Sequence, residues 1–234
     1  MVVHGNELRT IFWEFMPRDY MRRLLRVVAD AYSRAEYACI SHLELDGPEA
    51  DNTRWSVRRA FVEGGMRQLA TQFPTVHAEV IRGRDCPAPN PWNHTLISCG
   101  RVLLTQCTVM HPDDIVRPSI SREIYSLPNA QKLLFPELQP RRSKKVGDSP
   151  LYGILVHGRE VGTSAKLGFA FVRFPQPGAA EWYSERINLF SEFADSVAHL
   201  QRNADPSNEV VKLLPEESVD APKDPAIHEQ GQVE

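Results

Sequence analysis

Two histidines and three nearby charged side chains are the residues of this chain best suited to acid–base chemistry. They are His94, His111, Arg117, Arg122 and Glu123. Cleavage of RNA without a metal ion needs a general base, a general acid and a cation for the charge that develops on the phosphate. Histidine, glutamate and arginine supply these roles, so the five residues form a candidate catalytic set. The ordinary alternative is a strand-end histidine bonded to backbone and a solvated Arg122-Glu123 pair.

A basic segment overlaps this set and continues beyond it. Between residues 117 and 145, seven bases stand against two acids, a net charge of +5 over 29 residues. Cations this close repel one another unless water or an anionic partner screens them, and nucleic-acid phosphates are a common partner. A solvated loop is the alternative interpretation. The candidate nucleic-acid-binding residues are Lys132, Arg141, Arg142, Lys144 and Lys145.

Familiar catalytic motifs are absent from the sequence. It contains no P-loop, no dinucleotide-binding glycine fingerprint, no His-Glu-x-x-His and no Gly-x-Ser-x-Gly. We therefore expect no cofactor and no metal site. Asp113 and Asp114 are interpreted as turn formers, and whether they meet Glu79 at a metal is left open. The four cysteines lack a paired spacing and are expected to be reduced thiols.

The elements that must position these residues follow from hydrophobic periodicity. Apolar residues at steps of three and four predict helices at 8–16, 19–42, 53–73 and 181–200. Alternating or continuously apolar runs predict strands at 76–81, 93–99, 102–110, 151–157 and 167–174. Residues 111–150 are interrupted by six prolines and predict no regular element. We expect an α+β fold with two N-terminal helices and one C-terminal helix packed on a mostly antiparallel sheet of about five strands.

Three local features refine this prediction. Gly100-Arg101 suits a two-residue turn that pairs Cys99 with Val102, and the same register places His94 opposite Cys107. Gly64-Gly65 inside the second long helix predicts a close crossing or a kink, because glycine costs about 1 kcal/mol relative to alanine there. His157 ends a strand that is apolar on both faces and is interpreted as a core histidine.

Composition and charge divide the chain. Hydrophobic residues make up 42% and charged residues 24%, which is typical of soluble globular proteins. We expect one domain over 1–203, with a helical part at 1–74 and a sheet part at 75–203, followed by a disordered acidic tail at 204–234. The tail carries eight acids and two bases, a net charge of −6. Because the whole chain has a net charge of −3, the body carries +3. With no apolar run of bilayer length and no signal-peptide pattern, we expect a cytoplasmic protein and no membrane partner.

One short apolar patch interrupts the acidic tail. It is formed by Val210, Val211, Leu213 and Leu214. Short apolar patches in polar tails can fold on binding to a protein. We therefore take these four residues as a candidate partner-binding segment.

One pattern resembles a group of known proteins over about residues 76–175. Asn93-His94 opens a strand, and after the hairpin come Arg117, Arg122, Asn129, Leu133-Leu134-Phe135, Gly153 and His157-Gly158. This pattern resembles uncharacterised bacterial proteins of mobile-element, prophage and toxin–antitoxin neighbourhoods. The resemblance implies a phage-defence or toxin–antitoxin role and assigns no chemical role to any residue.

Three hypotheses follow. The first is a nucleic-acid-directed effector of such a system, RNase-like and independent of metal, acting on RNA or DNA and bound by a protein partner encoded nearby. The alternative is a non-catalytic protein-binding regulator, either a neutralising partner or an adaptor, because no strong catalytic motif is present. A third is a small-molecule sensor with a pocket beneath the Gly64-Gly65 crossing. The sequence leaves open whether the protein is an enzyme.

Overall fold

The computed structural model describes residues 7–42, 47–82, 93–117, 119–133, 150–177 and 181–197. These residues belong to one compact unit, Met1–Ala204, and a second unit comprises Asp205–Glu234. The acidic tail predicted at 204–234 lies outside the described residues. Within the described ranges, no helix has both the length and the apolar character needed to cross a membrane.

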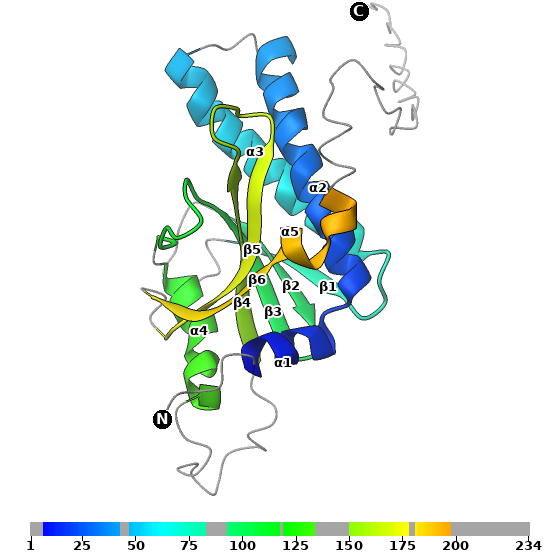
Figure 1. The fold of residues 1–234 in the computed structure, drawn as a ribbon, viewed down its shortest axis with the longest axis vertical. Helices are drawn as coiled ribbons and strands as arrows, with labels where there is room; N and C mark the ends of the chain where they lie inside the picture. The colour runs from blue at the N-terminus through cyan, green and yellow to red at the C-terminus, as the bar shows by residue number, and fades with distance from the viewer. Residues whose placement is uncertain are drawn as a thin grey trace, which may run out of the picture. The chain divides into compact units, whose positions relative to one another are not determined.

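A single mixed sheet of six strands forms the centre of the described unit (Figure 1). Its order follows the sequence, and every neighbouring pair is antiparallel except β3 and β4. Parallel neighbours need a crossover connection, and α4 (Ile120–Leu133) is the described helix within it. The strands are β1 (His77–Ile81), β2 (His94–Cys99), β3 (Val102–Thr108), β4 (Leu151–Arg159), β5 (Leu167–Pro175) and β6 (Trp182–Asn188).

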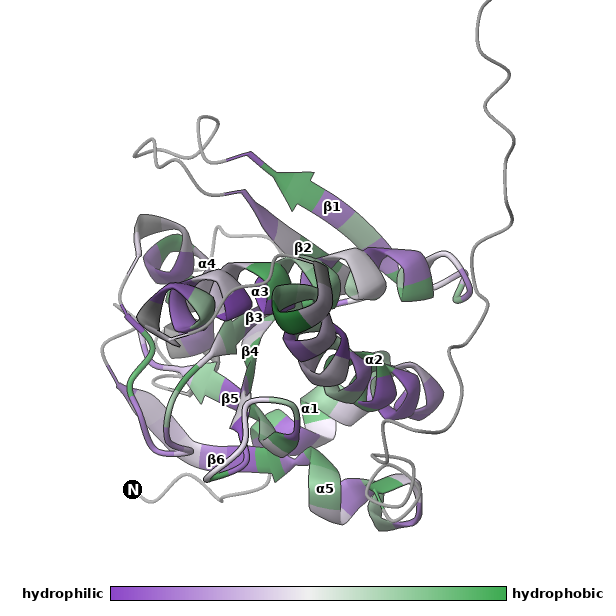
Figure 2. Cartoon of the chain, turned by 90° about the horizontal axis from the view of Figure 1, so that it is seen from above, coloured by the Kyte–Doolittle hydropathy of each residue, from purple (hydrophilic) through white to green (hydrophobic). Residues whose placement is uncertain are grey.

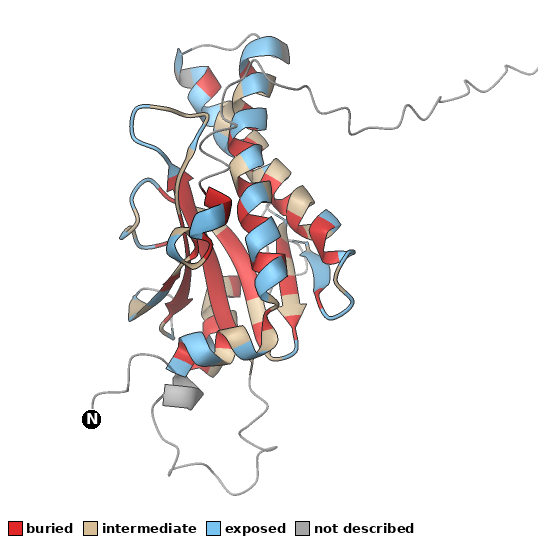
Figure 3. Ribbon diagram, turned by 45° about the vertical axis from the view of Figure 1, so that its right-hand side comes forward, coloured by how far each residue is buried: buried red, intermediate tan, exposed pale blue. Residues whose placement is uncertain are grey.

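The N-terminal helices lie close to their predicted positions. α1 (Glu7–Phe15) is followed by α2 (Arg18–Tyr37), which ends in a π-helical turn at Ala38–His42. Met21, Leu24 and Leu25 are fully buried on the sheet side of α2, whereas its arginines face outward. Figure 3 shows this division of α2 into a buried and an exposed side, beside the central strands, of which β4 and β5 are buried along most of their length.

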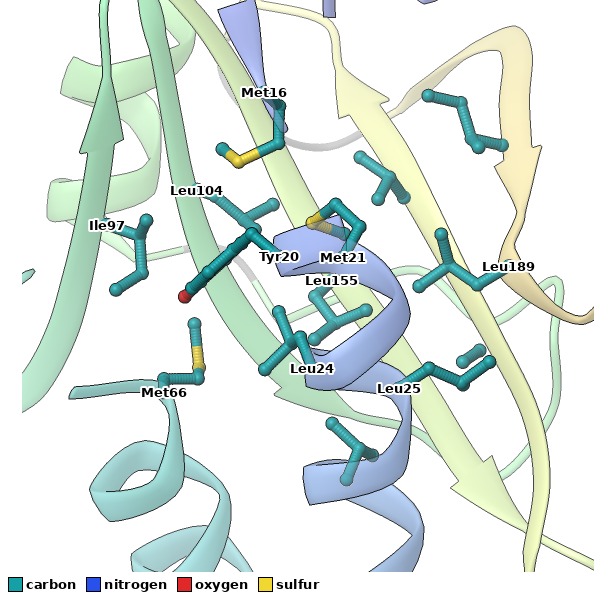
Figure 4. Packing of buried hydrophobic residues seen from close by; sticks show 14 of the residues in the cluster. Met16, Tyr20, Met21, Leu24, Leu25, Met66, Ile97, Leu104, Leu155 and Leu189 are labelled. Atoms are coloured by element: carbon teal, nitrogen blue, oxygen red, sulfur yellow. The ribbon is translucent and has the colours of Figure 1, made fainter. Parts of the chain in front are cut away.

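The larger core fills the space between α1, α2, α3 (Gly47–Ala70) and one face of the sheet. Figure 4 shows Met21, Leu24 and Leu25 of α2 together with Leu104 of β3 and Leu155 of β4. Full burial of one such side chain stabilises the fold by roughly 1.5–3 kcal/mol. Continuous burial of β4 from Leu151 to Gly158 confirms that this two-sided apolar strand is central.

A second, smaller core lies on the opposite face of the sheet, where α4 packs on β4 (Figure 2). Its buried members include Tyr152, Ile154 and Val156. Asn129 of α4 is fully buried and donates to the carbonyls of Tyr152 at 2.9 Å and Pro175 at 3.0 Å. Its side-chain oxygen accepts from the Tyr152 N–H at 2.8 Å. These three hydrogen bonds fix the position of α4 on the sheet.

The predicted close helix crossing is present at Gly65. A Cβ atom at this position would lie 2.3 Å from Cγ1 of Val27 on α2, so only glycine fits. At Gly64 the nearest atom to such a Cβ is Nη2 of Arg67, 3.9 Å away. Gly65, and not Gly64, therefore sets the distance between α2 and α3.

The β2–β3 turn also agrees with the sequence prediction. Gly100 has a φ of 53°, in the left-handed region that favours glycine, and Cys99 pairs with Val102. The pairing continues through Ser98 with Leu103 to Ile97 with Leu104. It has the offset expected for a two-residue turn.

Three expectations about elements were wrong. The helix expected at 181–200 is a strand, β6, over Trp182–Asn188, followed by the short helix α5 (Leu189–Glu192). Residues 182–188 pair with β5 as an antiparallel strand, and the helix begins only after Asn188, whose side chain accepts from the N–H groups of Phe190 and Ser191 and caps its start. The helix expected from 53 begins at Gly47 instead. The proline-rich stretch 111–150 contains a regular helix, α4, with Pro128 inside it.

Candidate functional site

A cavity of about 680 Å³ opens at one end of the sheet. Its walls are α3, α4, the start of β2 and the end of β3, and we call it the sheet-end cavity. α3 lines it with Trp55, Ser56, Arg59, Ala60 and Glu63. These positions recur at steps of one, three and four residues, which places them on one face of the helix. Neither Gly64 nor Gly65 lines it, so this cavity is not the pocket expected beneath their crossing.

The opposite wall is the first turns of α4. Ser119 precedes the helix, and its hydroxyl accepts from the N–H of Arg122 at 3.3 Å, an N-cap contact. The helix start is thereby fixed, and Ser121, Arg122 and Tyr125 line the cavity from it. β2 and β3 contribute His94, Gln106 and Cys107, together with their neighbours, between the two helices.

His94 is the histidine of this cavity. It is half-buried at the first position of β2, and its Nε2 lies 3.5 Å from the hydroxyl of Tyr125. Burial lowers the pKa of His94, and the charge of Glu63 raises it only in part, while Arg59 and Arg122 lower it further. The imidazole is therefore neutral near pH 7 and able to accept a proton.

Glu63 is a buried carboxylate that orients Arg59. Its Oε1 accepts from Nε of Arg59 at 2.9 Å and from Nε2 of Gln106 at 3.1 Å. Its other oxygen accepts from the Thr95 hydroxyl at 3.4 Å. Arg59 also donates to the carbonyl of Asn93 at 2.5 Å. These bonds neutralise the glutamate locally and hold the guanidinium at the wall of the cavity.

Arg122 supplies a second cation from the facing wall. Its Nη1 donates to the carbonyl of Arg117 at 2.7 Å. It also hydrogen-bonds the thiol of Cys107, which lowers the pKa of that thiol in part, although burial raises it more. The lining thus contains two arginines and one glutamate, so with His94 neutral its net charge is +1. Such a site favours an anionic ligand over a cationic one.

The other three residues of the predicted catalytic set do not line the cavity. His111 is exposed in a turn, where its backbone N–H donates to Asp114 at 2.8 Å. Arg117 is exposed and contributes its carbonyl group. Glu123 lies in the first turn of α4. The structure therefore brings together His94 and Arg122 from the predicted set of five.

The predicted nucleic-acid and partner residues are not placed by the structure. Lys132 belongs to the last turn of α4, and its side chain lies outside the described residues. The same holds for Arg141, Arg142, Lys144 and Lys145, and for Val210, Val211, Leu213 and Leu214.

The three acids that are candidate metal ligands, Asp113, Asp114 and Glu79, have different surroundings. Asp114 accepts from the N–H groups of Met110 and His111, which confirms it as a turn former. Asp113 pairs with Arg186 at 3.3 Å and Arg173 at 3.5 Å. Glu79 is exposed on β1. In the ranges that the structure describes, no three histidine, cysteine or acidic side chains are grouped so as to hold a metal ion.

A buried chain of polar groups connects the cavity to the core. Nε2 of Gln106 donates to Glu63, so its Oε1 faces Nε2 of His157 at 3.1 Å. Nδ1 of His157 lies 2.9 Å from the hydroxyl of Tyr32. His157 is fully buried, as a core histidine should be. Burial also raises the pKa of Tyr32. The guanidinium of Arg58 lies over the ring of Tyr32, 4.0 Å from the ring centre.

Sequence reasoning missed Arg59, Glu63, Gln106 and Tyr125. A signal for the first two exists in the four-residue steps from Trp55 to Arg59 to Glu63 along one helix face. Gln106 and Tyr125 carry no such signal, because their partners are distant in the sequence.

A comparison of the chain with protein-family models, with curated proteins and with solved structures finds no match. The functional argument therefore depends on the cavity and its residues.

Proposed function

We propose that this protein is a nucleic-acid-directed effector of a toxin–antitoxin or phage-defence type that cleaves RNA in the sheet-end cavity without a metal ion. The observation that carries the proposal is the meeting of His94 with two arginines, Arg59 and Arg122, in one cavity. The sequence resemblance to proteins of toxin–antitoxin neighbourhoods supports the biological setting.

The proposed reaction assigns a role to each side chain. Nε2 of the neutral His94 takes the proton of a ribose 2′-hydroxyl, and the 2′ oxygen forms a bond to the adjacent phosphorus. The bond from phosphorus to the 5′ oxygen breaks, and the 5′ oxygen leaves with the proton of the Tyr125 hydroxyl. Arg122 and Arg59 stabilise the charge on the phosphate oxygens. Protonated His94 then returns a proton to Tyr125 across their 3.5 Å contact.

The test measures both bacterial growth and cleavage of RNA by the purified protein. Induced expression of the wild type in a bacterial host is expected to arrest growth, and the purified protein to cleave RNA in the presence of a chelator. The products are expected to end in cyclic 2′,3′-phosphate. His94→Ala should remove both effects while the protein still accumulates folded. His77→Ala, which changes an exposed histidine on β1, is the matched control and should retain both.

Two results would contradict the proposal: cleavage that persists in His94→Ala, or a wild type that cleaves no RNA. The second result would favour a non-catalytic protein-binding regulator. That alternative predicts a stable complex with the product of a neighbouring gene that is lost when residues 204–234 are deleted.

A further inference from the structure

The wall of the sheet-end cavity contributed by α3 includes an aromatic side chain with no role in the proposed chemistry. Trp55 is 38% exposed although it is a large apolar residue, and it lines the cavity. An exposed indole beside a cavity presents a flat apolar face to whatever enters. Nucleobases stack on such faces, and every base has one to offer.

Trp55 stands one helical turn before Arg59 on the same face of α3. Side chains four residues apart on a helix lie about 5–6 Å apart at their Cβ atoms. This spacing is comparable to the distance between a base and the phosphate beside it. The hydrogen bonds of Arg59 to Glu63 and to Asn93 fix the guanidinium in place. The indole and the guanidinium thus offer adjacent contacts to one nucleotide, while Arg122 approaches from α4 and His94 from β2.

The cavity also limits the form of the nucleic acid. Its volume of about 680 Å³ is that of a small-molecule pocket and not of a groove for a double helix. Within a duplex, both faces of each base are already stacked and its polar edge is paired. A base must leave that stack before it can contact a tryptophan in a cavity. Unpairing and unstacking a base of a duplex costs a few kcal/mol more than turning out a base of a single strand.

We propose that the sheet-end cavity binds an unpaired nucleotide of a single-stranded nucleic acid, with its base stacked on Trp55 and its phosphate bound by Arg59 and Arg122. This inference rests on the proposed function and defines the substrate class of the same site. It makes Trp55 a specificity-determining residue, because it selects single strands over duplexes without reading the base.

Binding is tested with the full chain and a short 2′-deoxy oligonucleotide, which lacks the attacking hydroxyl and cannot be cleaved by the proposed reaction. The probe is used as a single strand, annealed to its complement, and as a single strand whose bases are removed. The wild type is expected to bind the intact single strand at least about tenfold more tightly than the duplex. Trp55→Ala should weaken single-strand binding by about five- to 100-fold, the size of base–aromatic stacking, and leave duplex and abasic binding unchanged.

Two further variants keep the test specific. Trp55→Phe retains an aromatic face and should recover part of the loss. Tyr37→Ala removes an exposed aromatic side chain of α2 that does not line the cavity, and it should bind as the wild type does. Equal binding by Trp55→Ala and the wild type, or equal affinity for single strand and duplex, would overturn the inference.

The outcomes also separate this inference from the proposed function. If RNA is cleaved in a His94-dependent way but binding ignores Trp55, the inference fails alone. If binding depends on Trp55 but no RNA is cleaved, the catalytic proposal fails alone. If the wild type binds neither strand and cleaves nothing, both fail.

Discussion

At the scale of single residues, His157 shows how the fold fixes a protonation state. Gln106 donates its amide to Glu63, so only its oxygen is left to face His157. Nε2 of His157 must therefore carry the proton, and Nδ1 must accept from Tyr32. Burial, with a smaller contribution from the charge of Arg58, lowers the pKa of His157 to about 3. The folded state thus keeps this histidine neutral.

This lowered pKa predicts a dependence of stability on pH. In the unfolded chain His157 titrates near pH 6.5. Below that pH the unfolded state therefore binds a proton that the folded state does not bind. The stabilising contribution is complete above about pH 6.5 and falls by about 1.4 kcal/mol per pH unit towards the folded pKa. Urea unfolding at pH 7.5 and 5.0 measures it. His157→Gln should show a smaller loss of unfolding free energy between these pH values, and an equal loss would refute this account.

Arg122 carries a prediction about catalysis. If it stabilises charge on the reacting phosphate, Arg122→Ala should lower the rate of RNA cleavage by about 100-fold or more. Arg122→Lys keeps the charge without the planar group and should recover part of the rate. Arg26→Ala, at an exposed position of α2 outside the cavity, is the matched control. RNA cleavage is measured for variants whose thermal melting is unchanged. A wild-type cleavage rate for Arg122→Ala would exclude a role of Arg122 in catalysis.

At the scale of elements, the α2–α3 crossing gives a prediction with its own control. Gly65→Ala would place a methyl group 2.3 Å from Val27 and force the helices apart. Overpacking of this kind costs about 1–3 kcal/mol. Gly64→Ala meets nothing closer than 3.9 Å and should gain up to about 1 kcal/mol from helix propensity. Denaturant unfolding of both variants is the measurement, and Gly65→Ala combined with Val27→Ala should recover much of the loss. Equal stability of the two single variants would contradict the close crossing.

The same scale shows what the sequence could predict. The two long N-terminal helices and the central hairpin were predictable because their apolar spacing reports directly on burial. β6 was not, because Ile187, Phe190, Phe193 and Val197 recur at steps of three and four residues and so predict a helix. The residues from Trp182 to Asn188 pair with β5 instead, and the helix begins only after the Asn188 cap. α4 was not predictable, because six prolines interrupt residues 111–150, whereas the helix is anchored by tertiary hydrogen bonds of Asn129 that the sequence does not reveal.

The candidate site was predictable in the same partial way. His94 and Arg122 were chosen by chemical type, and both line the cavity. Arg59 and Glu63 were overlooked because an Arg-x-x-x-Glu pair on a helix is usually a solvated surface pair. Only the sheet, by supplying Gln106 and Thr95, buries Glu63 and turns this pair towards the cavity.

At the scale of the whole molecule, the basic segment predicts a salt effect. Changing Arg141, Arg142, Lys144 and Lys145 together to alanine should weaken nucleic-acid binding at low salt. If all four contact phosphates of a single strand, the slope of log affinity against log salt should fall by up to about 3. Titrations from about 50 to 300 mM salt measure this slope. An unchanged slope would show that the segment is a solvated loop and that the cavity binds alone.

The acidic tail should act in the opposite sense. Residues 205–234 carry a charge of −6 and form a unit separate from Met1–Ala204, which is +3. A tethered polyanion competes with nucleic acid for cationic surfaces, so deleting 205–234 should raise affinity by roughly tenfold at about 50 mM salt, with little effect near 1 M. The melting temperature should not change, because the described hydrophobic cores are formed by residues between Leu8 and Val197. A full-length variant with the eight tail acids changed to their amides separates charge from chain: it should match the deletion. If the deletion binds more tightly and the amide variant does not, the tail blocks the site by its bulk or through Val210, Val211, Leu213 and Leu214 rather than by its charge.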